Sequence, residues 1–198
     1  PEALLKYNEK TSIFLFPDYI TDTLVSSCFN EIKIFLGSVG GIAVLKPLFG
    51  CSGKGIKLLQ LNDPELKNIV FKATNQEKDK VMIQKFISNV YEGETRVFML
   101  EDRPLAVMKK IPQKNNFKAN FDFGATGKPY SLNEKELELC MKIGAFFKRH
   151  EIVLGALDII DSKISEINIT SPGLLVETNI VNNYSYEKEI VNFLINML

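Results

Sequence analysis

The segment DIIDSKISEIN, which covers residues 158–168, joins two strand-like stretches through a short polar turn. IVLGALDII precedes the turn and ISEINIT follows it, and both are rich in the β-branched and apolar residues that favour strands. If residues 161–163 form a three-residue loop, Ile160 pairs with Ile164 in an antiparallel hairpin. The segment therefore predicts a β-hairpin, and its acids stand where packing residues are expected.

The same register places the carboxylates of Asp158 and Glu166 directly opposite each other, with Asn168 on the face of Glu166. Like charges opposed across a sheet are destabilising. At about 5 Å and an effective dielectric of about 20, their repulsion is about 3 kcal/mol. A bound cation would reverse this cost, and carboxylate and amide oxygens favour Mg²⁺. The alternative is a solvated face with ordinary acids, and a loop one residue shorter would move Asp158 off the direct pair.

Composition narrows the class of protein. The chain has 198 residues, of which 45% are hydrophobic, enough for a sizeable core in one domain or two small lobes. Lys and Arg total 24 and Asp and Glu total 24, so no field of one sign recruits nucleic acid or an acidic membrane. No apolar run is long enough to span a bilayer. The three scattered cysteines predict reduced thiols in a cytoplasmic protein.

The rest of the chain alternates between strand and helix patterns. Strands are expected at residues 42–48, 55–61 and 80–87, and in a hairpin over residues 95–111 that turns near residues 101–103. A helix is expected after Asp63 as N-cap, and another in the C-terminal YEKEIVNFLINML. Mixed strands and helices with many hairpins predict an α+β fold with mostly antiparallel sheets.

NEKELELCMKIGAFFKRH predicts the longest helix. Asn133 and Glu136 form a capping-box pair, and basic residues follow at the other end, where the helix dipole favours them. The predicted apolar stripe consists of Leu137, Cys140, Met141 and Gly144, widened by Leu139, Ile143 and Phe147.

A glycine-rich loop lies between two predicted strands in VLKPLFGCSGKGIKLL. It is not a Walker A motif, because its spacing differs and no helix follows. The backbone N–H groups of Gly50, Gly53 and Gly55 could still cover phosphates. Lys46 could reach a nucleotide, and Lys10 is a more distant candidate. The alternative is an ordinary glycine-rich hairpin. The acidic hairpin and the glycine-rich loop together favour a protein that binds a magnesium–nucleotide complex.

The order NEK, LKPLFGCSGKGI, IQKFI, EGETRVFML, KKIPQ, FKANF, LGALDII and SEINITSPG resembles bacterial glutathione synthetase, of the ATP-grasp superfamily. The resemblance implies an ATP-grasp fold, with a smaller lobe at residues 1–87, a larger lobe at residues 88–198, and a nucleotide bound between them. It implies the cofactors ATP and Mg²⁺, the latter as two ions. The family's N-terminal substrate domain is missing from these residues.

The resemblance also implies roles for individual residues. Metal ligands would be Asp158, Glu166 and Asn168. ATP would contact Lys10, Lys46, Gly50, Ser52, Gly53, Gly55, Gln84, Lys85, Phe86, Ile87 and Glu94. Catalysis would involve Arg96, Lys110 and Lys118. The acceptor pocket would include Arg96, Lys110, Lys118, Asn120, Thr170, Ser171 and Gly173.

The implied reaction is an ADP-forming ligation of γ-glutamylcysteine and glycine through an acyl phosphate, in a homo-oligomer that binds neither nucleic acid nor membrane. The sequence departs from the family pattern on the acceptor side. Lys110 and Lys118 replace arginines, Lys114 and Asn115 replace a glycine pair, and Gly173 replaces a threonine. Arginine binds carboxylates bidentately and lysine cannot. Two alternatives therefore stay open: another ATP-grasp carboxylate–amine ligase, and a non-catalytic nucleotide-binding domain.

Overall fold

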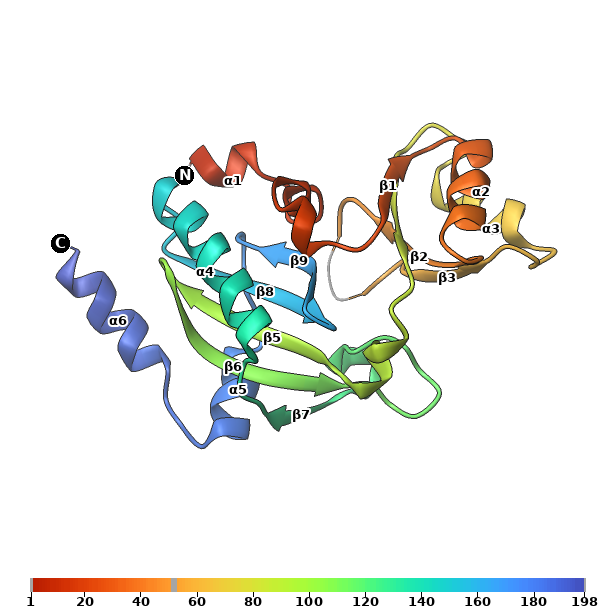
Figure 1. The fold of residues 1–198 in the computed structure, drawn as a ribbon. Coiled ribbons are helices and arrows are strands. Elements are labelled where there is room, and N and C mark those ends of the chain that lie inside the picture. Colours follow the sequence, from red (N-terminus) through yellow and green to blue (C-terminus); the bar gives the residue numbers. More distant parts are fainter. Residues whose placement is uncertain (1, 51–52, 198) are drawn as a thin grey trace. The chain divides into compact units, whose positions relative to one another are not determined.

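A computed structural model describes residues 2–50 and 53–197, and the chain divides into two compact units (Figure 1). The smaller unit is Ile20–Ser88, and the larger combines Pro1–Tyr19 with Asn89–Leu198. One boundary lies next to the one expected after residue 87, but the first nineteen residues group with the later part of the chain. Their grouping has a local cause, because the backbone amide of Ile167 donates to the carbonyl oxygen of Glu9 at 3.1 Å.

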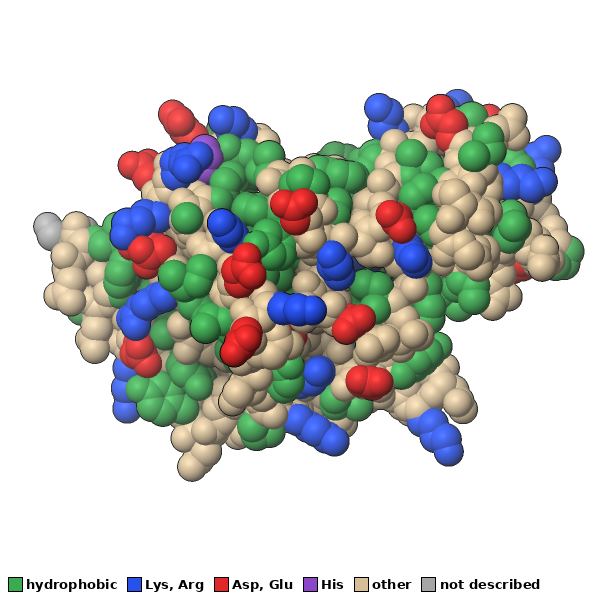
Figure 2. All heavy atoms as spheres, in the orientation of Figure 1, with side chains coloured by type: hydrophobic (Ala, Val, Ile, Leu, Met, Phe, Trp, Pro, Cys, Tyr) green, Lys and Arg blue, Asp and Glu red, His purple; other side chains and the backbone are tan. Residues whose placement is uncertain are grey.

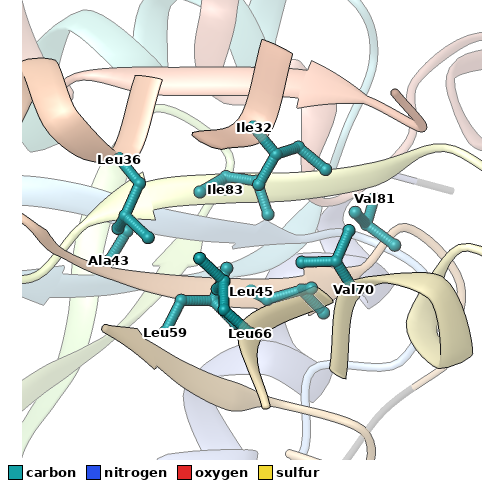
Figure 3. Packing of buried hydrophobic residues seen from close by; sticks show 9 residues of the cluster. All are labelled: Ile32, Leu36, Ala43, Leu45, Leu59, Leu66, Val70, Val81 and Ile83. Carbon is teal, nitrogen blue, oxygen red and sulfur yellow. The ribbon is translucent and has the colours of Figure 1, made fainter. Parts of the chain in front are cut away.

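The smaller unit is a four-stranded antiparallel sheet with two helices on one face. In spatial order the strands are β1 (Thr23–Ser26), β4 (Val81–Lys85), β2 (Ile42–Pro47) and β3 (Lys57–Gln60). The helices are α2 (Phe29–Ser38) and α3 (Leu66–Ala73). Their apolar sides meet the sheet in a core of nine buried residues, shown in Figure 3: Ile32, Leu36, Ala43, Leu45, Leu59, Leu66, Val70, Val81 and Ile83.

The larger unit is built on a five-stranded antiparallel sheet. In spatial order its strands are β7 (Thr126–Pro129), β6 (Arg103–Ile111), β5 (Glu94–Leu100), β8 (Leu154–Ile160) and β9 (Lys163–Asn168). Its α-helices are α1 (Glu2–Lys6), α4 (Glu134–Arg149), α5 (Leu175–Asn182) and α6 (Glu187–Asn196). Short 3₁₀ segments are η1 (Thr11–Leu15), η2 (Pro17–Tyr19) and η4 (Phe121–Phe123), and η3 (Ser88–Glu92) begins at the unit boundary. The expected α+β class with antiparallel sheets is confirmed.

Helix α4 confirms its predicted capping box but not all of its predicted stripe. The side chain of Asn133 accepts from the backbone N–H of Glu136, and the Glu136 side chain accepts from the backbone N–H of Asn133. Leu137 and Met141, however, are 47% and 54% exposed. The buried face is Glu136, Leu139, Cys140, Ile143, Gly144 and Phe147. Only glycine fits at position 144, because a Cβ there would collide with the backbone carbonyl oxygen of Asp102.

The two faces of the five-stranded sheet have different coverings. On one face, Phe147 of α4 packs over Gly155 of β8. On the other, the row Ala106, Phe98 and Ala156 contacts Leu175 of α5 and Tyr186. Two residues away from this row, the same face carries the charged Arg96 of β5 and Asp158 of β8 beside the apolar Met108 of β6.

Candidate functional site

The hairpin of β8 and β9 reaches its predicted pairing by a different route. Asp161 and Ser162 have φ angles of 50° and 58°, so the turn has two residues and Ile160 pairs with Lys163 rather than Ile164. Two successive positive φ angles match the twist of a hairpin. The register then shifts between Asp158 and Ile159, as in a β-bulge.

This shift restores the opposition of the two acids. Ile159 pairs with Ile164, yet Asp158 pairs with Glu166, which leaves Ser165 as the extra residue on β9. The predicted opposition of Asp158 and Glu166 is confirmed, and the three-residue loop that led to it is wrong.

The carboxylate of Asp158 is neutralised by two cations from other strands. The Nη1 of Arg96 donates to its Oδ2 at 2.7 Å, and the Nζ of Lys110 donates to its Oδ1 at 2.8 Å. Arg96 lies directly opposite Asp158 because β5 pairs with β8 in that register. The amide nitrogen of Asn168 also donates to Oδ2, at 3.2 Å.

Both cations hold further partners on the same face. The Nζ of Lys110 donates to Glu94, which lies opposite it on β5. The Nη2 of Arg96 donates to the carbonyl oxygen of Gly173 at 3.1 Å. Within residues 2–50 and 53–197, the Nε of Arg96 is a buried nitrogen without a hydrogen-bond partner. A buried donor without a partner is uncommon in native proteins, where such groups usually bond to protein or to ordered water.

The pKa values in this cluster follow from burial and pairing. Burial raises the pKa of Asp158, but attraction to Arg96 and Lys110 outweighs it and holds that pKa well below its usual range. Burial and repulsion from Arg96 lower the pKa of Lys110. Attraction to Asp158 and Glu94 outweighs both effects, so the pKa of Lys110 is raised. Lys110 and Asp158 are therefore both charged near neutral pH.

Glu9 and Lys10 contact the edge strand of the sheet and the residues that follow it. Strand β9 lies at the edge, so its outward N–H groups need partners from elsewhere. The Oε1 of Glu9 accepts from the backbone N–H of Ile169 at 3.0 Å and of Thr170 at 2.9 Å. The Nζ of Lys10 lies 3.4 Å from the Oε1 of Glu166. The structure thus places Lys10 beside the hairpin that carries the predicted metal ligands.

Glu9 is a residue that sequence reasoning missed. It stands inside the NEK motif, in which only Lys10 suggests a function by its residue type, because a lysine can bind phosphate. Nothing local in the sequence indicates that a glutamate will satisfy a strand 160 residues later.

The charged cluster on this face comprises Lys10, Glu94, Arg96, Lys110, Asp158 and Glu166. Three cations balance three carboxylates. The oxygens of Asp158, Glu166 and Asn168 are of the type that Mg²⁺ prefers, so the residues fit this metal in their chemistry. Among the described residues, no group of three or more His, Cys, Asp or Glu could hold a metal ion, and the three expected ligands here include only two carboxylates.

Two residues of the smaller unit that are expected to bind the nucleotide lie on β2 and β4. Lys46 and Gln84 alternate with the core residues Leu45 and Ile83, so they lie on the face opposite α2 and α3. The Nε2 of Gln84 donates to the Oγ1 of Thr23 at 3.2 Å. Lys46 is half-buried.

Strand β4 is hydrogen-bonded on both sides as far as Lys85. The backbone N–H of Lys85 donates to Asp22, and that of Phe86 donates to Ile42. Phe86 and Ile87 follow the strand and are half-buried. Backbone recognition of an adenine edge would therefore use groups at or beyond this strand end.

The glycines of the loop between β2 and β3 adopt left-handed backbone angles. Gly50, Gly53 and Gly55 have φ values of 107°, 67° and 75°. A Cβ at Gly55 would lie 2.7 Å from the ring of Pro47, so only glycine fits there. Ser52, the remaining expected ligand of this loop, lies outside the described residues.

The expected acceptor residues lie in two segments of the larger unit. The Nζ of Lys118 lies 4.3 Å from the centroid of the Phe123 ring, and the Oδ1 of Asn120 accepts from the N–H of Asp122 at 2.8 Å. Asn115, where the resemblance led us to expect a glycine, has φ of 66°, a left-handed angle that asparagine tolerates well. Thr170, Ser171 and Gly173 are exposed after β9.

Comparison with known proteins establishes the family. Residues 9–183 match the model of the prokaryotic glutathione synthetase ATP-grasp domain. The chain belongs to this family. It is 30% identical over 198 residues to a glutathione synthetase of Prochlorococcus marinus subsp. pastoris, covering 100% of this chain and 64% of the relative. It is 32% identical over 195 residues to a glutathione synthetase of Buchnera aphidicola subsp. Schizaphis graminum, covering 98% and 61%. The chain thus spans less than two thirds of these relatives.

Solved structures confirm the ATP-grasp fold. The ATP-grasp ligase PsnB, complexed with a phosphomimetic variant of its minimal precursor, Mg and ADP, is similar with a TM-score of 0.72 at 13% identity, covering 99% of this chain and 60% of PsnB. A D-alanine–D-alanine ligase from Bacillus anthracis is similar with a TM-score of 0.64 at 18% identity, covering 95% and 66%. Across the described residues, no helix is long and apolar enough to cross a membrane.

Proposed function

We propose that the protein carrying this chain is a glutathione synthetase, which joins γ-glutamylcysteine to glycine and converts ATP to ADP and phosphate. The observation that carries the proposal is the cluster around Asp158. Carboxylate oxygens of the type that Mg²⁺ prefers lie there beside two buried cations on one sheet face, which supports the proposal. The glutathione synthetases that the chain resembles over its whole length give the substrates.

The chemistry requires neutralised charge more than a protein nucleophile. The terminal carboxylate of the dipeptide attacks the γ-phosphate of ATP and forms an acyl phosphate, from which the amine of glycine then displaces phosphate. Mg²⁺ bound at Asp158, Glu166 and Asn168 would neutralise phosphate oxygens. Arg96 and Lys110 would stabilise charge on the migrating phosphoryl group.

The remaining residues receive roles within the same proposal. Phosphates would contact Lys10, Lys46, Gly50, Ser52, Gly53 and Gly55. The adenine would contact Gln84, Lys85, Phe86 and Ile87, with Glu94 beside the phosphates. Lys118, Asn120, Thr170, Ser171 and Gly173 would surround the acceptor, and closure of the segment around Lys118 would exclude water from the acyl phosphate. We further propose two Mg²⁺ ions, a cytoplasmic homo-oligomer, and no nucleic-acid partner.

A second ligase function is supported by one observation. Lys110 donates to two carboxylates of its own chain, Glu94 and Asp158. An ammonium so engaged recognises a substrate carboxylate less well than an arginine fork. This favours a different acceptor, joined by another ATP-grasp carboxylate–amine ligase.

Release of ADP tests these proposals. The purified protein is incubated with Mg²⁺, ATP, γ-glutamylcysteine and glycine, and each component is omitted in turn. ADP formation that requires all four, with glutathione as product, supports the synthetase. ADP formation with other carboxylates or amines, but not with this pair, supports the second ligase. Binding of Mg-ATP without turnover on any acceptor would contradict both and indicate a non-catalytic nucleotide-binding domain.

A further inference from the structure

The ammonium of Lys110 lies between two carboxylates of the charged cluster. Its ammonium is buried, with 5% of the residue exposed, and it contacts the carboxylates of both Glu94 and Asp158. A lysine ammonium is a compact point charge, so it can substitute for a cation between two carboxylates.

Both carboxylate oxygens of Asp158 are already engaged by side chains of the protein. Its Oδ1 accepts from Lys110, and its Oδ2 accepts from Arg96 and from the amide nitrogen of Asn168. Asn168 therefore presents its nitrogen, and its amide must turn before its oxygen can bind a metal. In this arrangement the side chains are bonded to one another rather than directed at an ion.

The charge balance of the cluster also disfavours the binding of a metal ion in this arrangement. Lys10, Arg96 and Lys110 balance Glu94, Asp158 and Glu166, so the site has no net negative charge to attract a divalent cation. A cation placed on Asp158 would also lie close to two fixed positive charges, and the repulsion is strong where water is excluded.

We propose that Lys110 is a resident counter-ion of the metal site, whose ammonium holds Asp158 and Glu94 in the nucleotide-free protein and leaves Asp158 when metal and phosphate bind together. The proposal rests on the proposed function for the identity of the metal and the nucleotide. Phosphate oxygens supply a new partner for the displaced ammonium, so nucleotide and metal each raise the affinity for the other.

Lys110 is better suited to this exchange than Arg96. Arg96 is held by the carbonyl oxygen of Gly173 as well as by Asp158. The lysine has a flexible four-carbon stem and rotatable donors, whereas a guanidinium is a rigid plane. Lys110 can thus move its charge without moving β6.

Binding of Mn²⁺ without nucleotide, followed by electron paramagnetic resonance, tests the exchange. Mn²⁺ accepts the same oxygen ligands as Mg²⁺. Lys110→Met should bind Mn²⁺ at least about tenfold more tightly than the wild type, because it removes one buried positive charge. Lys110→Arg keeps that charge and should remain within about twofold of the wild type.

The neighbouring lysine supplies a matched control. Lys109 lies on the same strand and its Nζ is 4.3 Å from the centroid of the Tyr130 ring, on the opposite face from Asp158. Lys109→Met should leave Mn²⁺ affinity unchanged, and Asp158→Asn added to Lys110→Met should abolish the gain. Tighter binding cannot come from damage to the fold, which lowers affinity. Unchanged or weaker binding by a Lys110→Met protein that unfolds in urea like the wild type would overturn the proposal.

A measurement on the wild type covers the case in which Lys110→Met does not fold. The ¹⁵N resonance of the Lys110 ammonium is followed while Mg²⁺ and a non-hydrolysable ATP analogue are added. A shift of this resonance that saturates with metal occupancy supports exchange, and an unmoved resonance at full occupancy overturns it. ADP formation is measured separately, so loss of the ligase proposal and loss of the exchange proposal are distinguished.

Discussion

The guanidinium of Arg96 and the carboxylate of Asp158 meet at 2.7 Å across the paired strands β5 and β8, where both residues are almost fully buried. Lys110 bonds the other oxygen of the same carboxylate. A buried carboxylate between two buried cations is costly to break from either side. Stability and proposed chemistry therefore depend on the same atoms.

Asp158→Asn should lower the free energy of unfolding by about 3 kcal/mol at pH 7, because it leaves Arg96 and Lys110 without their buried counter-charge. Urea unfolding measures the loss. A variant as stable as the wild type would show that the two cations find other partners.

The stability that the charge of Asp158 contributes should depend on pH. Its pKa is lowered in the folded protein, so its contribution is complete above the unfolded-state value of about 3.9 and is lost as the pH falls through the folded value. Lys110 has a raised pKa, so its contribution is complete below about 10.4 and is lost as the pH rises through the folded value. Urea titrations from pH 3 to pH 7 should show the gap between wild type and Asp158→Asn narrowing only below about pH 4.

Glu166→Gln should separate metal binding from stability. The carboxylate of Glu166 is 25% exposed and its ion pair with Lys10 measures 3.4 Å, so its loss should cost less than about 1 kcal/mol. The Mg²⁺-dependent affinity for ATP should fall about tenfold or more, because a charged oxygen ligand is removed. Isothermal titration with and without Mg²⁺ provides the measurement, and equal ATP affinity in both proteins would remove Glu166 from the metal site.

Arg96→Ala should lower turnover about 100-fold or more while changing ATP affinity only a few-fold, because its charge acts on the phosphoryl group in transit. Arg96→Lys serves as the control for stability. It keeps a positive charge beside Asp158 but loses the planar fork, so it should recover the unfolding free energy and not the turnover. If Arg96→Lys restored full turnover, charge alone would explain the role of this residue.

Asn133→Ala should destabilise the protein by about 1 kcal/mol through loss of the α4 capping box. ADP formation per folded molecule should not change, since α4 covers the face opposite the charged cluster. Lys135→Ala, an exposed change in the same first turn, is the matched control and should have little effect on thermal unfolding. An effect on turnover at equal folded fraction would link α4 to the site.

Local sequence patterns determined much of the fold. Asn133 and Glu136 identified the start of α4, because capping uses residues three apart. The alternation of apolar and polar residues identified the hairpin that carries Asp158 and Glu166. The predicted apolar stripe of α4 was wrong to include Leu137 and Met141, which are exposed. Helical periodicity alone does not show how closely the helix packs at Gly144.

The electrostatic partners of Asp158 came only from the tertiary structure. Arg96 and Lys110 precede it by 62 and 48 residues, and no local period connects residues on strands whose spatial order is β6-β5-β8-β9. The contact between the Glu9 side chain and the backbone N–H of Thr170 also joins residues 161 positions apart, so no local pattern predicts it. The sequence by itself determined which side chains could bind a metal and phosphate, because that depends on residue type. The sheet order decided that Asp158 is neutralised by the protein's own cations, because only the packed strands bring those charges within hydrogen-bond distance.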